Sequence, residues 1–270
     1  MPSLDWLIAR PIAHRGLHDA TAGVIENTAR AFSAAIAANY GIETDLQLSA
    51  DGEAMVHHDD ALGRLTEGTG RLADMSAAQI KAVRFKGGTD RIMTLGDLCE
   101  LVDGRAPLLL ELKSHLDGDV RLVERVASVL AGYAGPVAAM SFDPAQVEVI
   151  RRQAPALPRG IVAERHYTHH EWDRFSAVTK LRMAFLLHAG RTRPDFIAYA
   201  IKDLPGVAPL IARRVFGLPV LTWTVRSDAD RRRAAAYADQ IIFEGLHPSS
   251  APTQSRGTAK AAPINSQNVR

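Results

Sequence analysis

Residues 107–142 read PLLLELKSHLDGDVRLVERVASVLAGYAGPVAAMSF. Two short apolar runs, 107–113 and 136–142, flank a segment, 119–133, in which apolar residues recur at helical spacing. A near-continuous apolar run is typical of a strand that is buried on both faces, as in a parallel sheet covered by helices. This stretch therefore predicts a strand–helix–strand unit.

The same alternation extends in both directions along the chain. Apolar runs predict strands at 11–14, 41–49, 107–113, 136–142, 159–163, 195–201, 219–225 and 240–245. Helical patterns lie between them at 26–39, 119–133, 143–153, 178–190, 204–217 and 227–238. About eight such units predict an α/β fold of the closed (β/α)₈ barrel type. An open doubly wound sheet would normally begin with a glycine-rich G-x-G-x-x-G turn, which HRGLHDATAG at 14–23 is not.

One segment interrupts this rhythm. After the second strand, EAMVHH at 53–58 reads as a strand that returns against it, and 59–94 reads as an insertion with a short helix at 76–83. Long insertions at the carboxyl end of a barrel strand tend to cover active sites. We predict one barrel domain over 1–248. The last segment, 249–270, is rich in Ser, Ala, Pro, Thr and Gln without any period and is predicted to be disordered.

Composition excludes several classes of protein. Hydrophobic residues make up 47% and charged residues 23% of the 270, and the net charge is +2, so no nucleic-acid partner is expected. Cys99 is the single cysteine, which excludes an internal disulfide and a cysteine metal pair. The start of the chain lacks a secretory pattern, and no apolar run reaches about 18 residues. We expect a cytoplasmic protein without stable membrane association; the oligomeric state stays open.

Polar residues stand at the ends of the predicted strands. In a (β/α)₈ barrel the carboxyl ends of all strands meet at one mouth, where active sites form. Glu43 and Asp45 are two residues apart in one strand, so their side chains point to the same face. The other strand-end residues are His14, Arg15, His57, His58, Asp59, Glu111, Lys113, Ser141, Lys202, Trp223 and Glu244.

The carboxylates point to a metal site. Glu111 lies in a strand otherwise built of leucine, and a buried carboxylate costs several kcal/mol unless it is paired or binds a metal. Alone, Glu111 is equally consistent with an ion pair to Lys113, and Glu43 and Asp45 with an exposed strand face. Together, three inward carboxylates repel one another, and a divalent cation would neutralise them. Oxygen ligands favour Mg²⁺ or Ca²⁺, with Mn²⁺ as an alternative, over structural zinc.

The ordered set of motifs over residues 10–246 resembles the glycerophosphodiester phosphodiesterase family, a (β/α)₈ barrel with a small insertion after the second strand. The motifs are IAHRG, ENT, IETDLQLSADGEAMVHHDDALGRLT, TLGDL, LLLELK, SFDP and LTWTV. The resemblance implies two catalytic histidines, His14 and His58. It also implies metal ligands at Glu43, Asp45 and Glu111, and substrate-binding residues at Arg15, Lys113, Asn27 and Trp223.

The chemistry of phosphodiester cleavage agrees with this assignment. A cation with Arg and Lys donors stabilises the charge on the non-bridging oxygens, and two histidines supply a base and an acid. We expect a metal-dependent enzyme that hydrolyses glycerophosphodiesters, such as glycerophosphocholine or glycerophosphoethanolamine, to sn-glycerol 3-phosphate and an alcohol. The sequence does not decide whether water or the glycerol hydroxyl attacks. The alternatives are a phospholipase C- or D-like lipid phosphodiesterase and a non-catalytic barrel that binds phosphodiesters.

Two details of the motifs need separate interpretation. Adjacent strand residues face opposite ways, so only one of His57 and His58 points into the mouth, and we favour His58 because Asp59 follows it as in the family. The family often has Asn after WTV and a Thr-Asp pair at the end of the last strand. Here Arg226 and Phe243-Glu244 occupy those places. We expect both departures to lie outside the metal and histidine set and to act on the choice of head group.

Overall fold

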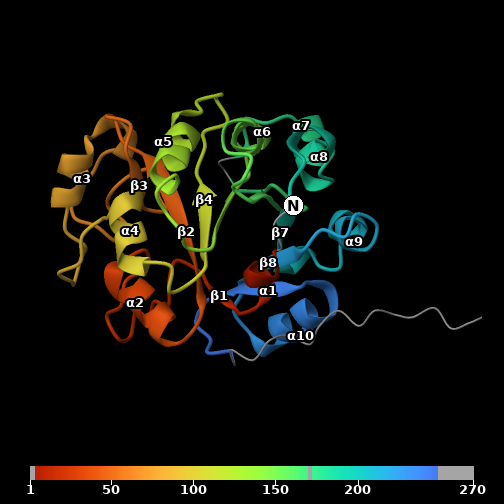
Figure 1. Ribbon diagram of the computed structural model, residues 1–270, viewed down its shortest axis with the longest axis horizontal. Coiled ribbons are helices and arrows are strands. Elements are labelled where there is room, and N and C mark those ends of the chain that lie inside the picture. Colours follow the sequence, from red (N-terminus) through yellow and green to blue (C-terminus); the bar gives the residue numbers. More distant parts are fainter. Residues whose placement is uncertain (1–3, 170–171, 249–270) are drawn as a thin grey trace, which may run out of the picture.

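The structure is a computed structural model that describes residues 4–169 and 172–248. Eight parallel strands form a closed barrel, because β1 pairs with β9 on one side and with β2 on the other. This confirms the predicted (β/α)₈ barrel (Figure 1). The strands are β1 (Ile12–Ala13), β2 (Gly41–Leu48), β4 (Leu108–Leu112), β5 (Val137–Ser141), β6 (Arg159–Ala163), β7 (Phe196–Ala200), β8 (Val220–Val225) and β9 (Gln240–Phe243).

Helices cover the outside of the barrel (Figure 1). They are α1 (Asp5–Ile8), α2 (Ala29–Ala37), α3 (Ala77–Ala82), α4 (Leu95–Val102), α5 (Arg121–Leu130), α6 (Pro144–Gln153), α7 (Ala177–Ala184), α8 (Ala189–Thr192), α9 (Val207–Arg214) and α10 (Asp228–Tyr237). Polar capping residues determine where several of these helices begin. Thr28 accepts a hydrogen bond from the Ala31 N–H, so α2 begins at Ala29 rather than at residue 26 as the sequence pattern suggested. None of the described helices is long and apolar enough to cross a membrane.

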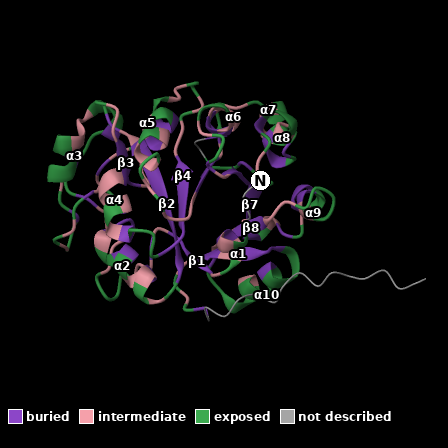
Figure 2. Cartoon of the chain, in the orientation of Figure 1, coloured by how far each residue is buried: buried purple, intermediate pink, exposed green. Residues whose placement is uncertain are grey.

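The barrel has an apolar interior and a separate apolar layer under its helices. The interior is filled by side chains from the strands, and Leu7 of α1 packs into the same cluster. Gly160 is required by this packing, because a Cβ atom there would lie 2.2 Å from the ring of Phe196. Most buried apolar residues of the helices pack in the outer layer against the strands. Figure 2 shows this burial concentrated along the strands and the inner sides of the helices.

An insertion follows β2. β3 (Ala54–Val56) pairs antiparallel with β2, and the chain then forms a 3₁₀ turn (Leu72–Asp74) and α3. A small apolar cluster of its own, which includes Met55, Leu72 and Ile80, holds this segment together. It lies beside α4 at the edge of the molecule (Figure 1).

The region between β6 and β7 departs from the predicted pattern. The single helix predicted over 178–190 is wrong: α7 ends at Ala184 and α8 begins at Ala189. Leu186, between them, has a backbone φ of +56°, which an α-helix does not accommodate. The predicted disordered tail, 249–270, lies outside the described residues.

Candidate active site

A pocket opens at the carboxyl end of the barrel strands. Its volume is about 520 Å³, and its wall includes predicted site residues from β2, β4 and β8 and from the segments that follow β1, β3 and β4. These residues are His14, Arg15, Asp45, His58, Glu111, Lys113 and Trp223. Polar residues distant in sequence therefore converge at one mouth, as expected for a parallel barrel.

Three carboxylates form the floor of the site. Glu43 and Asp45 come from β2, and Glu111 lies directly opposite Asp45 in the β2–β4 register. All three are buried, and one oxygen of each lies within 4.8 Å of the others. The geometry thus brings together the three residues that the sequence predicts as metal ligands.

Two cations neutralise part of this charge. Lys113 Nζ lies 2.8 Å from Asp45 Oδ1 and also donates to Glu111 Oε1. Arg15 Nε lies 3.2 Å from Asp45 Oδ2, and the Arg15 backbone N–H donates to Glu43 Oε2 at 3.0 Å. Burial raises the pKa of Asp45, but the charges of Lys113, His58, Arg15 and His14 together outweigh burial, and the pKa is lowered overall.

Glu43 is left with the weakest compensation. No lysine or arginine side chain among the described residues forms an ion pair with it. Burial and the charges of Asp45 and Glu111 raise its pKa well above the usual carboxyl value. A divalent cation bound by the three carboxylates would reverse this effect, so the donor set fits a hard, oxygen-ligated cation.

His14 is held by Glu244, one of the two departures from the family pattern. His14 Nδ1 lies 3.0 Å from Glu244 Oε2, and Arg226 donates to the same oxygen at 2.8 Å. The expectation that Arg226 and Glu244 lie outside the histidine set is therefore wrong. No local pattern predicts this contact, because His14 and Glu244 are 230 residues apart and meet only when β9 closes the barrel on β1.

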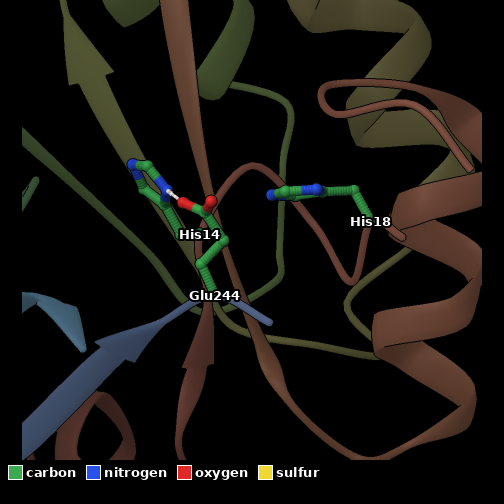
Figure 3. Close-up of side chains that lie close together, drawn as sticks. All are labelled: His14, His18 and Glu244. Carbon is green, nitrogen blue, oxygen red and sulfur yellow. Dashed lines mark hydrogen bonds and ion pairs between the residues drawn. The ribbon is translucent and has the colours of Figure 1, made fainter. Parts of the chain in front are cut away.

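Glu244 also lies beside a second histidine. Figure 3 shows the ring of His18 directed toward the Glu244 carboxylate from the loop after β1. Atoms of His14, His18 and Glu244 lie within 4.8 Å of one another. The Arg226 guanidinium already occupies this carboxylate, which disfavours a second metal ion there. The hydrogen bond from His14 and then Arg226 lower the pKa of Glu244.

The two adjacent histidines, His57 and His58, lie in different surroundings. His57 is buried, and its Nδ1 hydrogen-bonds to the Asp59 backbone oxygen at 2.9 Å. Burial lowers the pKa of its ring. His58 faces the pocket, and its Nδ1 lies 2.7 Å from Asp59 Oδ1. Arg64 holds Asp59 in turn, at 2.7 Å.

Asn27, predicted to bind substrate, contacts one of the three carboxylates. It is buried with a φ of +55°, donates from Nδ2 to Asp45 Oδ2 at 3.1 Å, and accepts a hydrogen bond from Thr44 Oγ1 at 2.7 Å. Both polar atoms of its amide are used inside the protein. Asn27 therefore orients the Asp45 carboxylate, and its contact with substrate stays a prediction.

Aromatic side chains form one side of the pocket. Trp223 packs edge-to-face on Phe142 with ring centres 5.6 Å apart, and Phe142 contacts Trp172 at 5.4 Å. Glu164 and Lys202 also face the pocket and form an ion pair of 2.7 Å. The sequence analysis did not select Phe142, Trp172 or Glu164. Trp172 and Glu164 lie between β6 and α7, in a connection that has no periodic pattern.

Comparison with known proteins identifies the family and agrees with the fold. The sequence pattern of the Glycerophosphoryl diester phosphodiesterase family matches residues 14–244. The chain is 30% identical to YhdW of Bacillus subtilis over 256 residues, which cover 87% of this chain and 98% of YhdW. It is 32% identical to a glycerophosphodiester phosphodiesterase of Caldanaerobacter subterraneus, with 86% of this chain and 93% of that protein covered.

Solved structures show the same barrel. A phosphodiesterase of Oleispira antarctica, crystallised with the product sn-glycerol-3-phosphate, superposes with a TM-score of 0.71 at 20% identity over 90% of this chain and 93% of its own. The glycerophosphodiester phosphodiesterase of Thermotoga maritima gives 0.64 at 21% identity, over 86% and 92%. The fold, the family pattern and the relatives agree, and the chain belongs to the glycerophosphoryl diester phosphodiesterase family of phosphoric diester hydrolases.

Proposed function

We propose that this enzyme hydrolyses glycerophosphodiesters, such as glycerophosphocholine or glycerophosphoethanolamine, to sn-glycerol 3-phosphate and a free alcohol. The product found in the Oleispira antarctica structure supports this class of substrate. Glu43, Asp45 and Glu111 would hold a divalent cation, Mg²⁺, Ca²⁺ or Mn²⁺. When bound, the cation supplies Lewis-acid stabilisation of the negative charge on phosphate oxygens.

One observation carries the proposal. His14 and His58 line the same pocket, and in both rings a carboxylate holds Nδ1. An ionised carboxylate only accepts hydrogen bonds, so Nδ1 of each ring carries the proton and Nε2 is left for the substrate. One Nε2 removes a proton from the attacking hydroxyl, and the other, in a protonated ring, donates to the leaving alkoxide.

Lys113 and Arg15 supply the donors for phosphate oxygens. Both line the pocket, and both contact the carboxylates of the floor. Charge-assisted hydrogen bonds from such groups strengthen as charge builds on the non-bridging oxygens. These contacts fix the phosphate above the carboxylates, between the two histidines.

The first test is release of glycerol 3-phosphate from glycerophosphocholine by the purified enzyme, with EDTA and then with each ion restored. We expect turnover only with a divalent cation. His14→Ala should lower kcat by roughly 10²–10⁴-fold while the melting temperature is kept. His166→Ala, at an exposed histidine outside the pocket, is the matched control.

Two results would argue against the proposal. Near wild-type kcat in His14→Ala would remove that histidine from the mechanism. No release with any ion would shift the substrate to an intact lipid or another diester, and tight binding without cleavage of all of them would indicate a binding protein.

A further inference from the structure

α9 is packed with its large apolar residues outward. Its small residues Ala208, Pro209 and Ala212 are buried against the barrel. Val207 and Ile211, which share one face of the helix, are 62% and 43% exposed. A surface helix normally buries its large apolar side chains and shows polar ones to water. α9 does the opposite.

The chain after α9 continues this apolar face. Val215 and Phe216 are each 70% exposed, and Leu210, on the preceding turn, is 42% exposed. Exposed side chains at 207, 211 and 215 are four residues apart, so they line up along one side of the helix. The outward side of α9 is therefore a continuous apolar stripe.

α7 repeats the arrangement. Met183 and Ala184 face inward, whereas Val178, Leu181 and Phe185 are exposed at the spacing of one helix face. Leu187 follows them and is also exposed. We call the exposed apolar residues of 178–187 and 207–216 the α7–α9 surface. Among the described residues, nine of ten exposed large hydrophobic side chains belong to it, the exception being Tyr237.

These helices lie on one side of the molecule. α7 and α8 follow β6, α9 follows β7, and β6 pairs with β7 in the barrel. Figure 1 shows α7, α8 and α9 together on the side opposite α2, α3 and α4. Single exposed hydrophobic residues are ordinary, but a concentration of this kind marks a contact surface.

The charged residues of the two segments that carry this surface are all basic. Segments 177–193 and 207–218 contain six basic residues and no Asp or Glu: Lys180, Arg182, Arg191, Arg193, Arg213 and Arg214. Arg191 pairs with Glu148, and Arg213 pairs with Asp239. The other four form no ion pair with any described residue. The excess is local, since the whole chain has a net charge of only +2.

We propose that the α7–α9 surface docks on an anionic lipid surface. Protruding apolar side chains flanked by Lys and Arg match the headgroup boundary of an anionic bilayer, where the apolar groups insert and the cations meet lipid phosphates. A second copy of the chain fits less well. A two-fold contact would bring these cations against the same cations, with no acidic residue on the helices to pair with them.

The position of the surface has a consequence for the active site. Trp172 lies in the connection that leads into α7, and Lys202 lies in the one that leads into α9; both residues line the pocket. Docking would therefore place the lipid against the wall of the barrel on the same side as these pocket residues. The sequence predicted no stable membrane association because no apolar run reaches about 18 residues, whereas the apolar residues here are spaced along helix faces.

Vesicle flotation tests the proposal. The full-length protein is mixed with vesicles of phosphatidylcholine alone, or of phosphatidylcholine and phosphatidylglycerol in equal parts. We expect binding to the mixed vesicles only. The double variant Val215→Ser with Phe216→Ser should bind at least about tenfold more weakly, because the inserting groups are removed. Both positions are exposed, so melting temperature should be preserved.

A charge-reversed pair tests the electrostatic part. Lys180→Glu with Arg214→Glu should weaken binding by about fivefold or more per site, since each surface cation contributes a factor of that order. Arg30→Glu with Arg84→Glu makes the same charge change and should bind like the wild type. Arg30 lies in α2 and Arg84 follows α3, and both helices lie on the opposite side of the molecule (Figure 1).

The proposal is overturned if the wild type does not bind mixed vesicles. It is also overturned if the two charge-reversed double variants bind these vesicles equally well. Size-exclusion chromatography with light scattering tests the alternative that a second copy of the chain covers this surface. A stable dimer that Val215→Ser with Phe216→Ser converts to monomer, without vesicle binding by the wild type, would make this surface an interface between copies.

Discussion

The contacts of individual side chains explain why two departures from the family pattern occur together. Glu244 holds Nδ1 of His14, and Arg226 holds Glu244, through the same oxygen. A glutamate and an arginine thus act as one unit behind the histidine. Arg226 also lines the pocket, so its effect on the choice of head group stays a prediction.

Replacement of Glu244 by Ala should lower kcat roughly 10–100-fold with a smaller change in KM, because His14 loses its orientation while the phosphate-binding cations stay in place. Glu244→Asp keeps a carboxylate and should recover part of the loss. Steady-state kinetics with glycerophosphocholine measures both values. An unchanged kcat with a raised KM would instead give Glu244 a role in substrate binding.

The predictable residues of the site share one property. Glu43, Asp45 and Glu111 sit in strands, where the period of two and the shared carboxyl edge fix their direction from sequence alone. Asn27 and Trp172 sit in connections, whose course depends on tertiary contacts. Their placement could not be derived from spacing.

The same contrast holds for secondary-structure elements. The alternation of strands and helices is local and periodic, so it predicts the barrel. The break between α7 and α8 depends on the left-handed backbone of Leu186, which no glycine or proline at that position announces. His188 then caps α8, and its Nδ1 is buried without a hydrogen bond to any described residue.

This histidine makes the α7–α8 region sensitive to acid. Burial, followed by the charges of Arg191 and Arg182, lowers the pKa of His188 to about 4. Its ordinary value is near 6.5, so the unfolded chain binds this proton more readily, and the stability present above pH 6.5 is lost as the pH falls toward 4. Between pH 7 and pH 5 we expect a loss on the order of 1–2 kcal/mol from this group.

Urea unfolding of the wild type and of His188→Gln at both pH values measures that loss. The variant cannot gain the charge, so its stability should fall less between pH 7 and pH 5. His14 and His57 are present in both proteins, so their contributions to the pH dependence of the free energy of unfolding cancel in the comparison. Equal losses in the two proteins would show that His188 is protonated as easily in the folded state as in the unfolded chain.

At the scale of the whole molecule, the folded sheet and the carboxylate site depend on each other. The three carboxylates come from β2 and β4, whose register places Asp45 opposite Glu111. That register exists only in the folded chain, so an ion bound there stabilises the fold by mass action. Burial and the two neighbouring carboxylates raise the pKa of Glu43, so the ion also relieves an unfavourable charge cluster.

A divalent cation should therefore raise the melting temperature without any substrate present. At an ion concentration of about 100 times Kd the gain is about 2.7 kcal/mol. For a chain of this size that corresponds to roughly 5–10 °C. Thermal unfolding followed by circular dichroism, with EDTA and then with Mg²⁺, Ca²⁺ or Mn²⁺, measures the shift. Glu111→Gln removes one ligand charge and should lose most of it. If the ion raised the melting temperature of Glu111→Gln as much as that of the wild type, the ion would bind outside the three carboxylates, because this variant lacks one of the proposed ligands.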